Sequence, residues 1–198
     1  PRVFPFGDYP IGPVWLGAAD SSRKSARSLA AVASRETLDL TVIDLVASMK
    51  SKAGSELAVR WRAKLLARPR AIASGDLGRD GKPEVAVITI EDELLVYTGP
   101  EAPKHLSLAK EHAVCALLAS DGERIAVGYQ ASKRVALLRA DGTPEKSVEL
   151  PGLPRAFTEA DLDSDGDTEL AVAAGDDLLE VFGLGRKGGC AAWLDEKP

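Results

Sequence analysis

Residues 154–172 read PRAFTEADLDSDGDTELAV, and the centre of this stretch, residues 161–169, carries five acidic side chains in nine residues. The acidic side chains occupy alternate places: Asp161, Asp163, Asp165, Asp167 and Glu169. A glycine stands at the sixth place, where a sharp turn needs one. Carboxylates this close repel one another unless a cation neutralises them, and Ca²⁺ takes six to eight oxygen ligands. The pattern predicts a calcium-binding loop, with an acidic surface turn that holds no ion as the alternative.

The residues around this loop exclude an EF-hand. That motif needs a glutamate at the twelfth place and a helix on each side, whereas Val172 stands at the twelfth place here. The flanking residues, 154–158 and 170–175, are short apolar runs bounded by proline and glycine. Runs of this kind are typical of β-strands. We therefore expect a calcium loop between two strands.

The same stretch occurs a second time, 85 residues earlier. Residues 69–87, PRAIASGDLGRDGKPEVAV, align with residues 154–172 without a gap, and ten of the nineteen pairs are identical. Weaker copies lie near Asp8, between Asp44 and Val59, and at Asp121. Repeats with a period of 20–50 residues are the signature of propellers and solenoids. Five such loops predict about five repeated units.

Each unit contains several short apolar segments separated by tight turns. The segments that follow the loops begin 28 to 45 residues apart. Four strands fit between one loop and the next, except in residues 57–76, which have room for only three short strands. Units of about 40 residues and four strands are typical of β-propeller blades. We predict an all-β fold, a β-propeller of about five four-stranded blades in a closed or incomplete ring. Residues 21–38 favour either a helix or two strands, and the alternation in residues 38–44 favours strands.

At its loops the chain resembles the FG-GAP/VCBS repeat family, which includes the integrin α-chain propellers. The resemblance is strong at residues 69–99 and 154–184, moderate at 112–140 and weak before residue 62. It implies one propeller domain over residues 1–198, in which residues 2–6 complete the blade that contains residues 178–194. It also implies that each calcium loop joins the outer strand of one blade to the innermost strand of the next.

The resemblance further implies two sets of calcium ligands. In the first, Asp161, Asp163, Asp165 and Glu169 would bind through side chains and Asp167 through its backbone carbonyl. In the second, Asp76, Asp80 and Glu84 would bind through side chains and Lys82 through its carbonyl. Gly78 occupies the third place of the second loop, so one carboxylate is missing there. We expect the second loop to bind calcium more weakly or not at all.

Composition and motifs restrict the function classes. Hydrophobic residues make up 45% of the chain and the net charge is −5, without a basic stripe that would bind nucleic acid. The sequence contains no apolar run long enough to cross a bilayer. His105, His112 and the three tryptophans are scattered, and the basic region 50–70 is typical of a solvated strand face. Cys115 is expected in the core, and its pairing with Cys190 stays open.

We therefore expect a non-catalytic, calcium-stabilised module that binds another protein or a glycan. One alternative is a subunit of a larger envelope assembly, whose ring is completed by neighbouring chains. A second alternative is a carbohydrate-active lyase or hydrolase. The family resemblance implies an extracytoplasmic location, at a cell surface, in a periplasm or secreted.

Overall fold

The computed structural model describes residues 10–16, 29–50, 58–164, 166–176, 178–183 and 192–194. These residues form four antiparallel sheets of four strands each and one short helix. The first sheet contains β1 (Pro10–Leu16), β2 (Leu29–Ser34), β3 (Asp39–Asp44) and β4 (Val59–Lys64). The second sheet contains β5 (Pro69–Gly75), β6 (Glu84–Thr89), β7 (Glu93–Tyr97) and β8 (Lys104–Ser107). The third sheet contains β9 (Ala113–Leu118), β10 (Arg124–Tyr129), β11 (Arg134–Arg139) and β12 (Pro144–Glu149). The fourth sheet contains β13 (Pro154–Ala160), β14 (Glu169–Ala174), β15 (Leu178–Gly183) and β16 (Ala192–Leu194).

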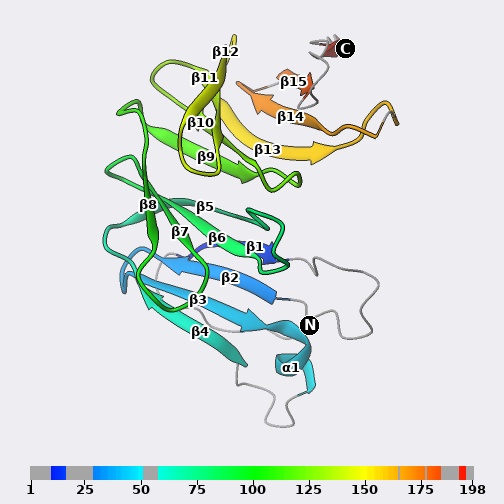
Figure 1. Cartoon of the computed structure of the whole chain (residues 1–198). Coiled ribbons are helices and arrows are strands. Elements are labelled where there is room, and N and C mark those ends of the chain that lie inside the picture. The colour runs from blue at the N-terminus through cyan, green and yellow to red at the C-terminus, as the bar shows by residue number, and fades with distance from the viewer. Residues whose placement is uncertain are drawn as a thin grey trace.

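Within each sheet the strands lie side by side in chain order, so every sheet is a simple up-and-down meander (Figure 1). The all-β prediction and the four-stranded unit are confirmed. The helix α1 (Leu45–Lys50) has six residues, and no helix of the described residues is long and apolar enough to cross a membrane. Residues 29–34 are a strand, as the alternation beside them favoured, whereas residues 17–28 lie outside the described part of the chain.

The predicted position of the acidic loops within the blade was wrong by one strand. In the fourth sheet β13 pairs directly with β14, with Ala160 opposite Glu169. In the second sheet β5 pairs with β6 in the same way, with Gly75 opposite Glu84. Each acidic loop is therefore a hairpin connection between the first two strands of one sheet. It does not join an outer strand to the next sheet, because the two strands that flank it are hydrogen-bonded to each other.

The described residues also form four sheets where the repeat count predicted about five. One of the five predicted loops lay between Asp44 and Val59, but this segment connects β3 to β4 inside the first sheet and contains α1. Another lay near Asp8, outside the described residues. Residues 2–6 also lie outside them, so the predicted pairing of residues 2–6 with the last blade stays a prediction, as does the single domain over residues 1–198.

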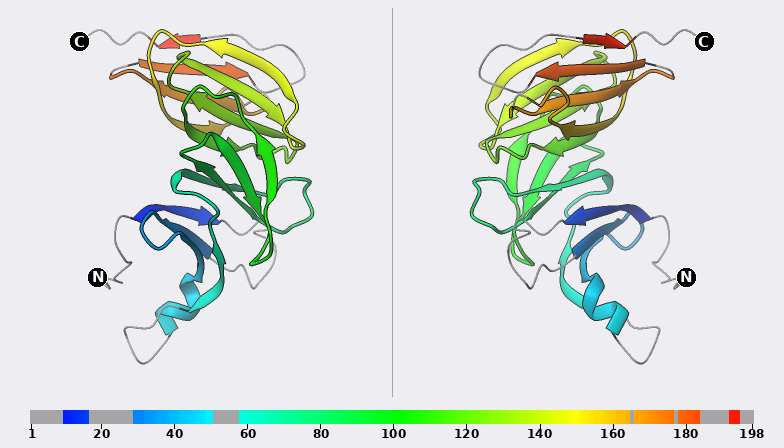
Figure 2. Two further views of the ribbon diagram at one scale, coloured as in Figure 1. Left: turned by 90° about the vertical axis from the view of Figure 1, so that its left-hand side faces the viewer. Right: turned by 90° about the vertical axis from the view of Figure 1, so that its right-hand side faces the viewer.

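The four sheets follow one another as successive layers, with the first and fourth at opposite ends (Figure 2). Their first strands lie together, because β5 contacts both β1 and β9, and β9 contacts β13. Among the described residues this is an open series of sheets rather than a closed ring.

The hydrophobic core lies between successive sheets. All six residues of β6 are buried, because its two faces contact different neighbours. Val85 and Val87 pack against residues of the first sheet, whereas Ala86 and Ile88 pack against the third sheet. This explains why the four central residues of β6, 85–88, form a continuous apolar run, as in strands buried on both faces. A third cluster joins the third and fourth sheets through residues such as Val135 and Val172.

Candidate metal centre

The loop between β13 and β14 is held by its own first and last carboxylates. Asp161 Oδ2 accepts a hydrogen bond of 3.2 Å from the backbone N–H of Gly166. Glu169 Oε2 accepts one of 2.7 Å from the backbone N–H of Leu162. Ser164 and Gly166 take positive φ values of 63° and 90°, which turn the chain back on itself. The acidic residues at the two ends of the loop thus fix its path while their remaining oxygens stay available.

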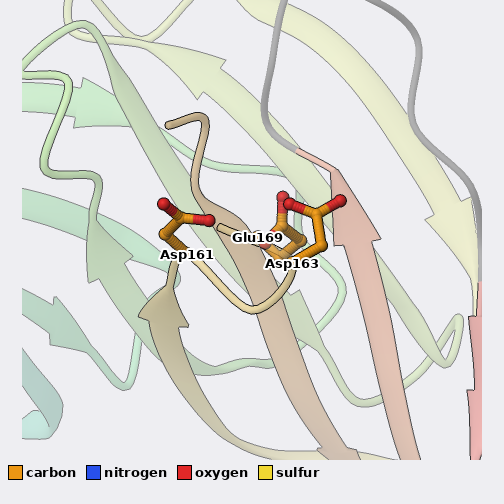
Figure 3. Close-up of side chains that lie close together, drawn as sticks. All are labelled: Asp161, Asp163 and Glu169. Atoms are coloured by element: carbon orange, nitrogen blue, oxygen red, sulfur yellow. The ribbon is translucent and has the colours of Figure 1, made fainter. Parts of the chain in front are cut away.

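Three carboxylates gather inside this loop. One oxygen each from Asp161, Asp163 and Glu169 lies within 4.8 Å of the other two (Figure 3). Ca²⁺ binds oxygen at about 2.3–2.6 Å, so ligands on opposite sides of one ion are about 4.6–5.2 Å apart. A single calcium ion therefore fits among these three groups. The structure brings these predicted ligands together, whereas Asp165 lies outside the described residues. Asp167 was predicted to contribute only its backbone carbonyl, and it does not belong to the carboxylate group.

The loop between β5 and β6 has the same internal hydrogen bonds at the positions 85 residues earlier. Gly81 N–H donates to Asp76 Oδ2 at 3.0 Å, and Leu77 N–H donates to Glu84 Oε2 at 2.7 Å. Arg79 and Gly81 have positive φ values of 55° and 79°, as Ser164 and Gly166 do. The identical residues at places one, six and nine of the loop thus produce the same backbone path.

The second loop does not assemble the same group of carboxylates. Asp80 Oδ1 accepts a 2.9 Å hydrogen bond from the backbone N–H of Lys82, and its Oδ2 lies 3.3 Å from the Lys82 ammonium. With Gly78 at the third place, no cluster of three metal-binding side chains forms in this loop as the structure describes it. The expectation that this loop is the poorer calcium site stays a prediction.

Negative charge in the second loop is poorly compensated. Glu84 is almost fully buried, and burial raises the pKa of its carboxyl group to about 7, with a further contribution from the nearby Asp80 and Asp76. Asp76 Oδ1 is buried, and no hydrogen-bond partner contacts it among the described residues. An unpaired buried carboxylate oxygen is costly. A cation or a proton would relieve the charge here.

In the corresponding turn of the third sheet, an arginine pairs with the aspartate. Asp121 Oδ2 lies 2.5 Å from Arg124 Nη2, and Asp121 Oδ1 accepts hydrogen bonds from the backbone N–H groups of Glu123 and Arg124. Arg124 stands at the start of β10, where β6 and β14 have Glu84 and Glu169. From the sequence this turn was predicted only to be a weaker copy of the repeat. The change from glutamate to arginine at the same place was the signal that this prediction missed.

Neighbouring loops are connected across the sheets. Glu159, on β13, accepts hydrogen bonds from the backbone N–H and the hydroxyl of Ser120, at 2.7 and 2.8 Å, and from the hydroxyl of Thr168. Ser120 belongs to the turn between β9 and β10, whereas Thr168 belongs to the acidic loop. The backbone carbonyl of Gly122, in the same turn as Ser120, accepts a 2.7 Å hydrogen bond from Gly78 N–H. The turn of the third sheet thus contacts the acidic loop of the second sheet directly and that of the fourth sheet through Glu159.

The cysteines, histidines and tryptophans were the other residues considered for catalysis or binding. Burial raises the pKa of the Cys115 thiol to about 12, so this thiol is not a reactive nucleophile at neutral pH. Trp61 packs against the core between the first two sheets. His112 takes a φ of 56° immediately before β9, and its backbone N–H donates to Asp92. Cys190 lies outside the described residues, so its pairing with Cys115 stays open.

Comparison with known proteins shows the fold alone. No family model and no curated protein matches the sequence. Among solved structures, the chain is similar to the crystal structure of BBS1N in complex with ARL6DN, soaked with lead, with a TM-score of 0.61 and 16% identity. The match covers 87% of this chain and 50% of that chain, so the chain spans about half the length of this structural relative. The likeness shows a propeller-like arrangement of antiparallel four-stranded sheets.

Proposed function

We propose that this chain is a non-catalytic, calcium-stabilised propeller module that binds another protein or a glycan outside the cytoplasm. The observation that carries the calcium part is the group of Asp161, Asp163 and Glu169, whose oxygens lie within 4.8 Å of one another. The ligand type favours calcium, because the group offers oxygen atoms and neither thiolate nor imidazole. Two of the three carboxylates are exposed, so the ion would reach the loop from solvent.

The binding role is supported by the ion pairs of the chain, which connect structural elements to one another. The buried or half-buried pairs join neighbouring elements: Arg70 contacts Asp92 at 2.7 Å and Arg134 contacts Glu111 at 2.9 Å. Such groups stabilise sheets and turns rather than converge on a substrate. The solved relative BBS1N forms a complex with ARL6DN. A protein partner is therefore our first choice for this chain, and a glycan is the second.

One alternative is a subunit of a larger envelope assembly, and it is favoured by a specific observation: the described sheets form an open series. The chain also spans about half of the BBS1N chain. The other alternative, a carbohydrate-active lyase or hydrolase, predicts turnover of a polysaccharide by the purified chain. Product release from such a substrate would replace the binding role with an enzymatic one.

Thermal unfolding with and without calcium tests the metal site. Extracellular calcium modules bind with dissociation constants of about 10⁻⁴–10⁻³ M, and a ligand at 100 times its dissociation constant stabilises by about 2.7 kcal/mol. We expect calcium to raise the Tm of the wild type, and Asp163→Asn to remove most of that rise, measured against the Tm of the same variant in EDTA. Asp141→Asn is the matched control, since Asp141 is an exposed turn aspartate between β11 and β12. Identical melting curves in calcium and EDTA would exclude the metal site.

A further inference from the structure

The strand β4 is the outermost strand of the first sheet, and the charges along it are all positive. Residues 59–68 contain four basic side chains and no acidic one, in a chain whose net charge is −5. The four are Arg60, Arg62, Lys64 and Arg68, and all are exposed. Among the described strands β4 pairs with β3 alone, so its other edge is open (Figure 1).

The backbone groups of Arg62 and Lys64 lie at this open edge. In an antiparallel pair, alternate residues of a strand bond to the neighbouring strand and the others face away from it. The backbone N–H of Leu65 donates to the carbonyl of Leu38 at 2.7 Å, so the odd-numbered residues at this end of β4 bond to β3. Arg62 and Lys64 therefore direct their N–H and C=O groups away from β3, where an added strand would pair with them.

The two arginines of β4 are unpaired, whereas four arginines elsewhere form ion pairs. The paired ones are Arg70, Arg124, Arg134 and Arg155. Arg60 and Arg62 form no ion pair with any residue that the structure describes. Lys64 lies 2.7 Å from Asp39, yet its side chain is still 74% exposed. The open edge thus keeps at least two positive charges that no described carboxylate contacts directly.

Apolar side chains accompany these charges. Successive side chains of a strand point to opposite faces, so Trp61 lies on the opposite face from Arg62. Trp61 is half-buried and packs against the core between the first two sheets. Val59 and Leu66, at the two ends of this segment, are 38% and 64% exposed. An extended segment with alternating acidic and apolar residues would match both the charged and the apolar positions.

We infer that the open edge of β4 binds an extended, acidic segment of a partner protein as an additional strand. The acidic side chains of that segment stand opposite Arg62 and Lys64, because directly opposed residues of paired strands have Cβ atoms about 4.5–5.5 Å apart. Main-chain hydrogen bonds give affinity in strand addition, and the alternating side chains give specificity. The inference rests on the proposed binding role, for which it names the chemistry of the partner.

The charges of β4 also determine which strands are rejected. A second copy of β4 would place like charges opposite one another, which is unfavourable. Two other outer strands lack a run of one sign. The strand β12 carries Glu145, Lys146 and Glu149, and β8 has only four residues, of which Lys104 already donates a 3.0 Å hydrogen bond to the carbonyl of Ala140. The edge of β4 therefore favours an acidic strand from a different protein.

Fluorescence anisotropy with a capped, fluorescein-labelled peptide of sequence TEVEVEVT tests the charge requirement. We expect the wild-type chain to bind this peptide and not TKVKVKVT, and to bind about tenfold or more weakly when NaCl is raised from about 50 to about 500 mM. The double variant Arg60→Glu with Arg62→Glu should also weaken binding by about tenfold or more. The matched control is Lys133→Glu with Arg139→Glu, which changes the net charge equally at two exposed residues elsewhere and should leave binding unchanged.

Two methylated peptides separate strand addition from simple charge attraction. Because Arg62 and Lys64 have the outward backbone groups, the residues opposite them, the glutamates, form the main-chain hydrogen bonds. N-methylation of the glutamates should therefore abolish binding, whereas N-methylation of the same number of valines should preserve most of it. The two peptides have the same charge, and neither change affects folding of the protein. Equal binding of the two peptides would overturn the inference.

Three other results would also overturn the inference. The first is that TEVEVEVT does not bind the wild type. The second is that polygalacturonate binds through Arg60 and Arg62 while the peptide does not, which would assign the edge to a glycan. The third is self-association of the chain that the double variant abolishes, which would assign it to a second copy. A protein that co-purifies equally with the wild type and the double variant would overturn this inference while the binding role stands.

Discussion

Replacement of Glu84 by glutamine should stabilise the protein at alkaline pH and leave it nearly unchanged at acid pH. Glu84 lies at the start of β6, is 5% exposed, and accepts a hydrogen bond from Leu77 N–H through Oε2. Glutamine has almost the same shape and keeps an oxygen that accepts this bond. It removes only the charge, which lies close to the carboxylates of Asp76 and Asp80.

The magnitude follows from the pKa of Glu84, which burial raises from 4.5 to about 7. A carboxyl group whose pKa is higher in the folded state prefers to be protonated there. The protonated Glu84 contributes fully to the free energy of unfolding below pH 4.5, and this contribution is lost as the pH rises through 7. One pKa unit corresponds to about 1.4 kcal/mol, so the loss between pH 5 and pH 8 is about 2 kcal/mol. In a domain of this size that corresponds to roughly 4–8 °C in Tm.

The assay is thermal unfolding in EDTA at pH 5 and pH 8 for the wild type, Glu84→Gln and the control Glu145→Gln, which changes an exposed glutamate on β12. We expect the advantage of Glu84→Gln over the wild type to grow with pH, and the control to show no such trend. A lower Tm for Glu84→Gln at pH 8 would refute the reasoning. Addition of calcium at pH 8 then tests the second loop, because an ion bound there would favour the wild type.

Three further predictions concern the contacts between loops and sheets. Arg124→Ala should cost about 1–3 kcal/mol in urea unfolding, equally in calcium and EDTA, because it leaves the partly buried Asp121 without its cation. Gly128→Ala should cost about 1–3 kcal/mol, because the added Cβ would lie 2.7 Å from Cys115 Sγ, and the double variant with Cys115→Ala should recover part of this loss. Arg70→Lys should lower the Tm by a few degrees, roughly 1–2 kcal/mol, because an ammonium cannot make the forked contacts that Arg70 makes to three acceptors.

The part of the structure that the sequence could predict rests on residues that determine local geometry. Asp, Gly and Glu stand at places one, six and nine in both well-kept loops, and both loops have matching backbone paths and hydrogen bonds. The prediction that the second loop is the poorer site followed from Gly78 and stays a prediction, although the only cluster of three metal-binding side chains among the described residues lies in the other loop. The pairing of Asp80 with Lys82 could not be predicted, because it depends on where two exposed side chains turn.

Strand pairing was harder to predict than loop geometry. An acidic loop between two apolar strands has the same sequence whether those strands pair with each other or belong to different sheets. The segment from Asp44 to Val59 was also misleading, because it copies the two ends of the repeat although it contains α1 and joins β3 to β4. The number of repeats was therefore overestimated where the match rested on a few residues at the ends of a segment.

The ion pair of Asp121 with Arg124 has a consequence for how the molecule comes apart. The three hairpins treat their negative charge differently. Asp121 of the third sheet pairs with the guanidinium of Arg124, whereas the acidic loop of the fourth sheet gathers three carboxylates that suit a dissolved cation. In the second sheet Asp76 Oδ1 has no hydrogen-bond partner among the described residues. A drop in calcium concentration would therefore destabilise the fourth sheet and leave the second and third sheets unchanged. Loss of a calcium ion from the proposed site would then be a local opening event with its own free energy, rather than a uniform weakening of the whole protein.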